Sequence, residues 1–227
     1  MFGSPADMIA RAIVFLIAMA VHEFAHAYGA YLMGDTTAQE QGRMTLNPLA
    51  NIYWPGFIIA VLGGPAILGS APVNPYRMRN RRWGMFVAVL AGPVSNLIVA
   101  ALVSVLFRLR LVPLYSPTGG LLGTLIPTLP MLLVTLVWFN IVLFIFNLLP
   151  LYPLDGWTVW MALLPARPAV WMQRHQQEST YVLFGLILLS FIGPQLSAIS
   201  PVLGYFDPLH WLIGVPGSAI FNLMVGA

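Results

Sequence analysis

His22, Glu23 and His26 lie in a stretch of the chain that is otherwise apolar, and their types and spacing are those of a metal-dependent hydrolase. Apart from Arg11 and these three side chains, residues 8–33 have the apolar composition of a membrane-embedded segment. On a helix, residues i and i+4 lie one above the other, so the two histidines can present two nitrogens to one metal ion. Glu23 lies one residue round the helix and can reach a water molecule on that ion. The spacing predicts a zinc site with a general base beside it.

A buried, hydrogen-bonded histidine cluster without a metal is the alternative interpretation. One His-x-x-x-His pair occurs often by chance and is weak evidence by itself. Ionisable side chains at membrane depth, however, cost about 2.5 to 3.5 kcal/mol each on insertion scales. A buried set without a function would be hard to sustain there, so we favour the metal site.

The composition indicates an integral membrane protein. Of 227 residues, 59% are hydrophobic and only 7% are charged. We expect one membrane-embedded domain over residues 1–227, with its core at 7–164 and C-terminal helices at 180–227. The ten basic residues are all scattered arginines without an aromatic-basic pattern, which makes nucleic-acid binding unexpected. The chain has no cysteine, so only His, Asp and Glu are candidate metal ligands.

Four apolar stretches are long enough to cross a bilayer, at residues 7–33, 83–107, 129–149 and 180–199. A fifth stretch at 205–225 is interrupted by polar residues and prolines, and we expect a broken or interfacial helix there. The sequence therefore predicts an all-α polytopic membrane protein with about four to five transmembrane helices.

The connection between the first two spans, residues 34–82, contains a short apolar piece at 57–71 that Gly63-Gly64-Pro65 interrupts. Irregular backbone at membrane depth is tolerated only where protein covers it or it lines a water-filled cavity. We expect a re-entrant segment or a short β segment here, beside the site.

The arginines predict the orientation in the membrane. Seven of them lie on the side of the 34–82 connection and three on the other side, so the connection is expected in the cytoplasm. The count is the same whether or not residues 57–71 cross the membrane. Only the re-entrant arrangement puts His22 and His26 in the cytoplasmic half, close to Asp155, and this places the active site nearer the cytoplasmic side.

Asp155 is the strongest candidate for a third metal ligand. Zinc in hydrolases usually takes three protein ligands and leaves a fourth position to water. Five of the other acids lie in expected loops or termini, whereas Asp155 follows two prolines that break the helix and precedes a glycine that allows close approach. It could instead cap a helix over residues 157–164, which is compatible with ligation by its other oxygen. His175 and His210 are weaker candidates because polar or interfacial residues flank them.

Four motifs occur in a fixed order along the chain: His22-Glu23-Phe24-Ala25-His26, Gln41-Gly42-Arg43 to Asn47-Pro48, Ala91-Gly92-Pro93-Val94-Ser95-Asn96, and Asn147 through Gly156. With them, residues 22–162 resemble the site-2 protease family of intramembrane zinc metalloproteases, in its small prokaryotic form without PDZ or CBS domains. The resemblance implies a multi-pass protein of the cell membrane that cleaves transmembrane helices of membrane protein substrates. It also implies that His22, His26 and Asp155 hold one Zn²⁺ per chain, with Glu23 as the catalytic base.

Asn96 and Asn147 match polar positions of the family motifs, which suggests substrate-positioning roles. The alternative for both is a hydrogen bond between helices in lipid. An unwound substrate segment could pair with a strand formed by residues 41–47. The chain departs from many relatives at Asn51 and Tyr53, where they carry His and Asp.

Two other functions stay open at this point. A catalytically silent homologue could act as a scaffold that binds membrane proteins, although the intact Glu23 argues against it. A metal transporter would be expected to carry a second ionisable cluster in the opposite half of the membrane, and the sequence shows none.

Overall fold

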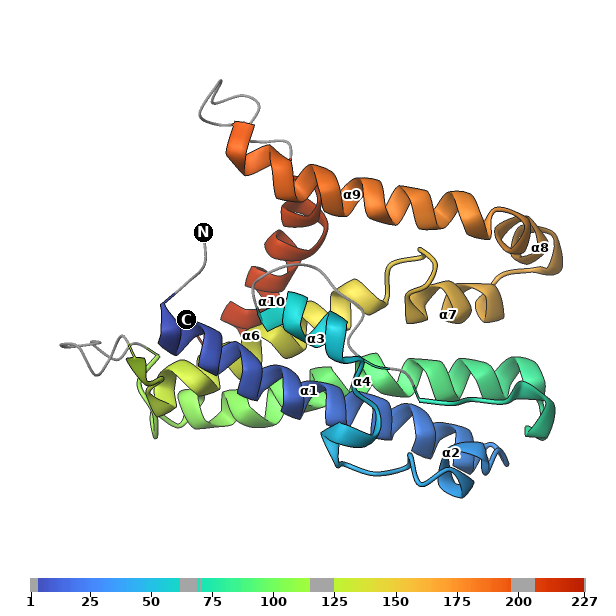
Figure 1. The fold of residues 1–227 in the computed structure, drawn as a ribbon, viewed down its shortest axis with the longest axis horizontal. Helices are drawn as coiled ribbons and strands as arrows, with labels where there is room; N and C mark the ends of the chain where they lie inside the picture. The colour runs from blue at the N-terminus through green and yellow to red at the C-terminus, as the bar shows by residue number, and fades with distance from the viewer. Residues whose placement is uncertain (1–3, 62–68, 70, 115–124, 197–206, 227) are drawn as a thin grey trace.

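Three long helices form the body of the molecule. The structure, a computed structural model, describes residues 4–61, 69, 71–114, 125–196 and 207–226. Within these residues, α1 (Pro5–Leu32), α4 (Arg81–Arg108) and α6 (Leu129–Asn147) are long and apolar enough to cross a membrane. Figure 1 shows α1 and α4 running along each other for most of their length. The all-α class is confirmed, and helices long and apolar enough to cross a membrane occupy the first three expected spans, in keeping with a multi-pass membrane protein.

The close approach of α1 and α4 depends on small side chains. A Cβ atom at Gly29 would lie 3.1 Å from the Cα of Ala88 and 3.1 Å from the Cβ of Ala91. Ala30 and Ala88 are completely buried in the same contact. Backbones can approach this closely only where the side chains between them are small. The contact fixes α4 against the half of α1 that carries the histidines.

The segment between α1 and α4 begins and ends at the same end of the helix bundle. The backbone N–H of Arg79, just before α4, donates to the carbonyl of Met33, just after α1, at 3.0 Å. In between, α3 (Trp54–Val61) has eight residues and spans about 12 Å, which is too short for a bilayer core of about 30 Å. The end-to-end contact supports the re-entrant arrangement, although residues 62–68 and 70 lie outside the described part.

Residues 41–47 form turns and not the strand that the sequence suggested. Gly42 adopts a φ of +65°, which ends the short helix α2 (Thr37–Glu40), and the N–H of Arg43 folds back to the carbonyl of Ala38 at 2.8 Å. In the described part of the chain, β pairing is limited to one antiparallel bridge between Ile52 and Gly69. Apart from this bridge, the described residues do not confirm the expected β segment.

Asp35 fastens the two ends of the connection together. Its carboxylate accepts the N–H of Asn74 at 2.6 Å and the N–H of Thr37 at 3.0 Å, and it also accepts the Thr37 hydroxyl. Burial raises the pKa of Asp35, but these hydrogen bonds outweigh burial and hold the pKa below its usual value. The charged carboxylate thus anchors the chain just after the cavity-lining residues 71–73.

The C-terminal third of the chain begins where α6 ends. After α6 come α7 (Asp155–Leu163), α8 (Ala166–Arg174), α9 (Gln176–Leu196), a π-turn (His210–Gly214) and α10 (Val215–Val225). The fourth expected span corresponds to α9, which runs apart from α1 and α4 in Figure 1. Residues 197–206 lie outside the described part, so the total of four to five membrane crossings stays a prediction. Short 3₁₀ turns occur at Pro48–Ala50 and Pro75–Arg77.

Candidate metal centre

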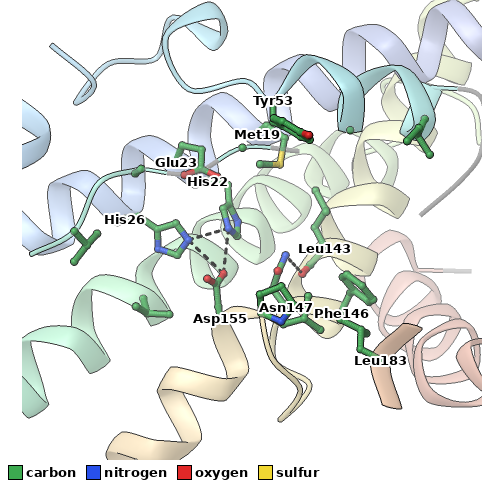
Figure 2. A pocket seen from close by; sticks show the side chains of 18 of the residues that line it. Met19, His22, Glu23, His26, Tyr53, Leu143, Phe146, Asn147, Asp155 and Leu183 are labelled. Atoms are coloured by element: carbon green, nitrogen blue, oxygen red, sulfur yellow. Dashed lines mark hydrogen bonds and ion pairs between the residues drawn. The ribbon is translucent and has the colours of Figure 1, made fainter. Parts of the chain in front are cut away.

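Three side chains from two helices meet at one point (Figure 2). Nε2 of His22 and Nε2 of His26 lie 2.9 Å apart, and Oδ2 of Asp155 lies 3.2 Å from the first and 3.3 Å from the second. The histidines come from neighbouring turns of α1, and Asp155 is the first residue of α7. Among the described residues, this is the group of acidic and histidine side chains with atoms close enough to share a metal ion.

Hydrogen bonds to α4 fix which nitrogen of each ring carries a proton. Nδ1 of His26 lies 2.8 Å from the carbonyl oxygen of Ala88, which can only accept, so this Nδ1 is the donor. The amide of Asn96 donates to the carbonyl of Ala18 at 3.2 Å, so its oxygen faces His22, and Nδ1 of His22 donates to that oxygen at 2.6 Å. In the neutral rings both Nε2 atoms are therefore acceptors, and both point at Asp155.

The donor set fits a zinc ion. Two imidazole lone pairs and a carboxylate oxygen point at one another, and none of the three atoms carries a proton. Beyond its contacts with the imidazoles, Oδ2 of Asp155 has no hydrogen-bond partner among the described residues. Acceptors in this arrangement repel one another unless a cation lies among them. Two histidines and one carboxylate form a common ligand set of catalytic zinc, and a second hydrogen bond from each histidine is usual in such sites.

Gly92 allows α4 to pass directly behind the two rings. A Cβ atom at Gly92 would lie 2.9 Å from Cε1 of His22 and still closer to the ring of His26. A side chain at this position would therefore push the histidines out of their arrangement. The glycine belongs to a motif that the sequence singled out, but its contact with the histidines depends on how two helices cross.

Asp155 is presented by the start of α7 and does not cap it. The residue before the helix is Leu154, and it makes no side-chain capping bond, so the helix-cap interpretation of Asp155 is wrong. The next residue, Gly156, is packed so tightly that a Cβ atom would overlap the backbone of Leu148 and Leu149. The chain reversal after α6 therefore brings α7 against the end of α6 and turns the carboxylate of Asp155 toward the histidines.

Glu23 lies in the same cavity and is almost completely buried, with 3% of its surface exposed. Its Oε2 has no hydrogen-bond partner among the described residues. A Cβ atom at Gly69 would lie 3.0 Å from Oε1 of Glu23, so the absence of a side chain at Gly69 leaves room for the carboxylate. A buried carboxylate without a donor is available to accept a proton.

The cavity around these side chains has a volume of about 740 Å³. Figure 2 shows His22, Glu23 and His26 on one side, with Leu143, Phe146 and Asn147 of α6 and Leu183 of α9 across from them. Tyr53 and Ile59 contribute from the segment between α1 and α4. Away from the polar cluster, the lining is mostly apolar.

The two asparagines differ in position. Asn96 is completely buried, does not line the cavity, and links α4 to α1 and to Asn140 of α6, whose oxygen accepts its amide at 2.8 Å. Asn147 lines the cavity, and its amide donates to the carbonyl of Leu143 in its own helix at 3.0 Å. The helix-linking alternative thus describes Asn96, and Asn147 has the access that substrate positioning requires.

Sequence reasoning did not identify Asn140 or the carbonyl of Ala88, and it named Gly92 only as part of a motif, without its contact with the histidines. Asn140 could have been noticed, because a polar side chain in the middle of an apolar span usually has a partner in the bundle. A backbone carbonyl leaves no trace in the sequence. Asn51, one of the departures from the family pattern, is buried and holds the turn at Arg43, whose carbonyl accepts its amide at 3.0 Å.

The sequence matches the family described as Peptidase family M50 over residues 123–191. It is 36% identical over 182 residues to "Putative zinc metalloprotease YwhC" of Bacillus subtilis, which covers 80% of this chain and 80% of that protein. It is 30% identical over 210 residues to "Putative zinc metalloprotease Rip2" of Mycobacterium tuberculosis, covering 89% of this chain and 72% of the relative. A Rip2 of Mycolicibacterium smegmatis is 29% identical over 218 residues. No solved structure matches the chain.

Proposed function

Because the chain belongs to peptidase family M50, the site-2 protease family of zinc metalloproteases, we propose that it cleaves peptide bonds within or near transmembrane helices of other membrane proteins. The observation that carries the proposal is the convergence of His22, His26 and Asp155 beside the buried Glu23, in a cavity between helices long enough to cross a membrane. We assign the first three residues as ligands of one Zn²⁺ and Glu23 as the general base.

When bound, zinc would supply Lewis-acid chemistry: it would lower the pKa of water in the site and polarise the scissile carbonyl. Glu23 accepts the proton of the attacking water and returns it to the nitrogen of the leaving amine. Its burial without a hydrogen-bond donor favours both transfers, because nothing competes for its Oε2. Asn96 and the carbonyl of Ala88 keep the two histidines in the tautomer that ligation needs.

The substrate segment occupies the apolar part of the cavity. A transmembrane helix hides its carbonyls in its own hydrogen bonds, so the segment must unwind before its carbonyl can be attacked. The apolar side chains of α6 and α9 receive the side chains of the unwound segment, and Asn147 offers its amide oxygen to the freed backbone. Substrates with helix-weakening residues near the cleavage point are expected.

We propose that the end of the bundle with the site faces the cytoplasm of a prokaryotic cell. The start of α4 and the segment before it carry Arg77, Arg79, Arg81 and Arg82, whereas Arg108 and Arg110 lie at the opposite end of α4. Basic residues favour the cytoplasmic side. Single cysteines in place of Tyr76 and Leu111, which are 75% and 67% exposed, should react with a membrane-impermeant reagent from opposite sides. Labelling of Tyr76→Cys from outside intact cells would reverse the orientation.

The other two functions have less support. The relatives are named as metalloproteases, which favours neither a scaffold nor a transporter. A transporter needs a series of sites across the membrane, and in the described residues the metal-binding geometry is confined to one cluster.

The proposal is tested by separating metal binding from turnover. Glu23→Gln keeps the size of the side chain but cannot accept a proton, so zinc should remain bound while cleavage of a single-span reporter in liposomes falls about 10² to 10⁴-fold. Asp155→Ala should weaken zinc binding and abolish activity. A Glu23→Gln protein that holds zinc and cleaves as fast as the parent chain would contradict the mechanism, and a parent chain that cleaves no membrane-spanning reporter would contradict the function.

A further inference from the structure

The position of Asp155 depends on a helix that is too short to be stable by itself. α7 has nine residues, begins at Asp155 without a side-chain cap, and ends at Leu163. Isolated helices of this length are marginal in water, and the last carbonyls of any helix have no partner within it. Something outside α7 must therefore hold its C-terminal end.

Arg82 binds that end. Its Nε donates to the carbonyl of Ala162 at 2.7 Å, and its Nη2 donates to the carbonyl of Leu164 at 2.7 Å. The guanidinium thus bridges two carbonyls at the negative end of the helix dipole, with charge-assisted hydrogen bonds in a planar fork. Arg82 lies in the first turn of α4, about 80 residues away in the sequence.

The N-terminal end of α7 is held separately. Gly156 packs against the backbone of Leu148 and Leu149, and Nε1 of Trp160 donates to the carbonyl of Leu148 at 3.2 Å. Ala162 lies seven residues, or about 10 Å, along the helix from Asp155. These contacts hold α7 at both ends, with the carboxylate of Asp155 opposite the histidines.

α4 therefore aligns all three candidate ligands. Further along the same helix, the carbonyl of Ala88 binds His26 and the amide oxygen of Asn96 binds His22. We propose that Arg82 is a positioning residue for the metal site: by bridging the carbonyls of Ala162 and Leu164 it sets the tilt of α7 and so holds Asp155 at ligand distance from His22 and His26. This inference rests on the proposed function for its zinc readout.

Arg81 is the matched control. It is the neighbouring residue, it is also exposed, and its guanidinium lies 4.5 Å from the centre of the Tyr76 ring. Arg81→Gln removes the same charge from the same turn. Arg82→Lys keeps the charge but lacks the fork that reaches two carbonyls, so it should restore only part of what Arg82→Gln loses.

The first measurement is zinc affinity by competition with a chelator. Loss of a residue that orients a ligand typically weakens metal binding 10- to 100-fold, and we expect about 10-fold for Arg82→Gln and no change for Arg81→Gln. If Arg82 acts through Asp155, Arg82→Gln should cause no further loss in an Asp155→Ala chain. An equal loss in both backgrounds, or equal effects of the Arg81 and Arg82 variants, would overturn the proposal.

The second measurement needs no zinc, and the absence of native cysteine makes it direct. Spin labels at Leu163→Cys on α7 and Leu109→Cys at the end of α4, both exposed, report the distance between the two helices. Arg82→Gln should broaden or shift this distance distribution, and Arg81→Gln should not. A parent chain that bound no zinc would contradict the proposed function but would leave the distance measurement valid. An unchanged distance distribution in Arg82→Gln would overturn the positioning role of Arg82.

Discussion

On one side of the cavity, α1, α4 and α7 hold His22, His26 and Asp155 with hydrogen bonds and close packing, and we call these helices the ligand wall. On the other side, α6 and α9 present mostly apolar side chains, and we call these helices the apolar wall. Each Nδ1 of the ligand wall has a defined partner in α4. In the apolar wall, the amide of Asn147 donates to a carbonyl of its own helix. The ligand wall is preorganised for one chemistry, whereas the apolar wall can receive side chains of different shapes.

The largest effect is expected from filling the space behind the histidines. Gly92→Ala places a methyl group where the rings lie, so both must move, and zinc binding should weaken by roughly 100-fold or more. Gly185→Ala in α9 is the control, because a Cβ atom there meets nothing within 4 Å. Elemental analysis of the purified proteins measures the difference. A Gly92→Ala protein with the full zinc content would show that the ligand wall is not tightly packed.

A smaller effect is expected from removing the partner of His22. Asn96→Leu keeps the approximate size of the side chain but leaves Nδ1 of His22 without an acceptor, so zinc affinity should fall about 10- to 100-fold. Asn147→Leu, on the apolar wall, should leave zinc affinity unchanged, because the hydrogen bond that the structure describes for the Asn147 amide stays within its own helix. Chelator competition on both variants is the measurement. Equal losses in the two variants would remove the distinction between the walls.

The smallest effect is expected from trimming the apolar wall. Ile187→Ala removes part of the apolar lining contributed by α9 and should raise the KM for a single-span reporter up to about 10-fold, with kcat and zinc content unchanged. Steady-state cleavage in liposomes with zinc analysis checks this. If zinc were lost from this variant, the two walls would not be independent.

The helices and the paired histidines were predictable because each depends on neighbours along one segment. Long apolar runs predict α1, α4 and α6, and the spacing of four residues puts His22 and His26 on one face. Asp155 could be singled out because five of the other six acids lie in expected loops or termini. These inferences need no knowledge of how the helices pack.

The residues that the sequence did not reveal act between segments. Gly92 contacts the histidines of α1, Asn140 binds Asn96 of α4, and Arg82 binds the end of α7. The helical period within one segment does not specify which residues of another helix it will contact. The strand expected at residues 41–47 failed for a related reason: Gly42 in a left-handed conformation and the hydrogen bonds between Arg43 and Asn51 fold the segment back on itself.

X-ray absorption spectroscopy of the zinc-loaded protein tests the central assignment most directly. We expect one zinc per chain, surrounded by two imidazole nitrogens at about 2.0 to 2.1 Å and by oxygen ligands, with no sulfur. The spectrum should be unchanged in Glu23→Gln. In Asp155→Ala it should lose the carboxylate contribution, or the zinc should be absent. A spectrum with fewer than two imidazoles, or an identical spectrum and zinc content in Asp155→Ala, would contradict the assignment of His22, His26 and Asp155 as the metal ligands.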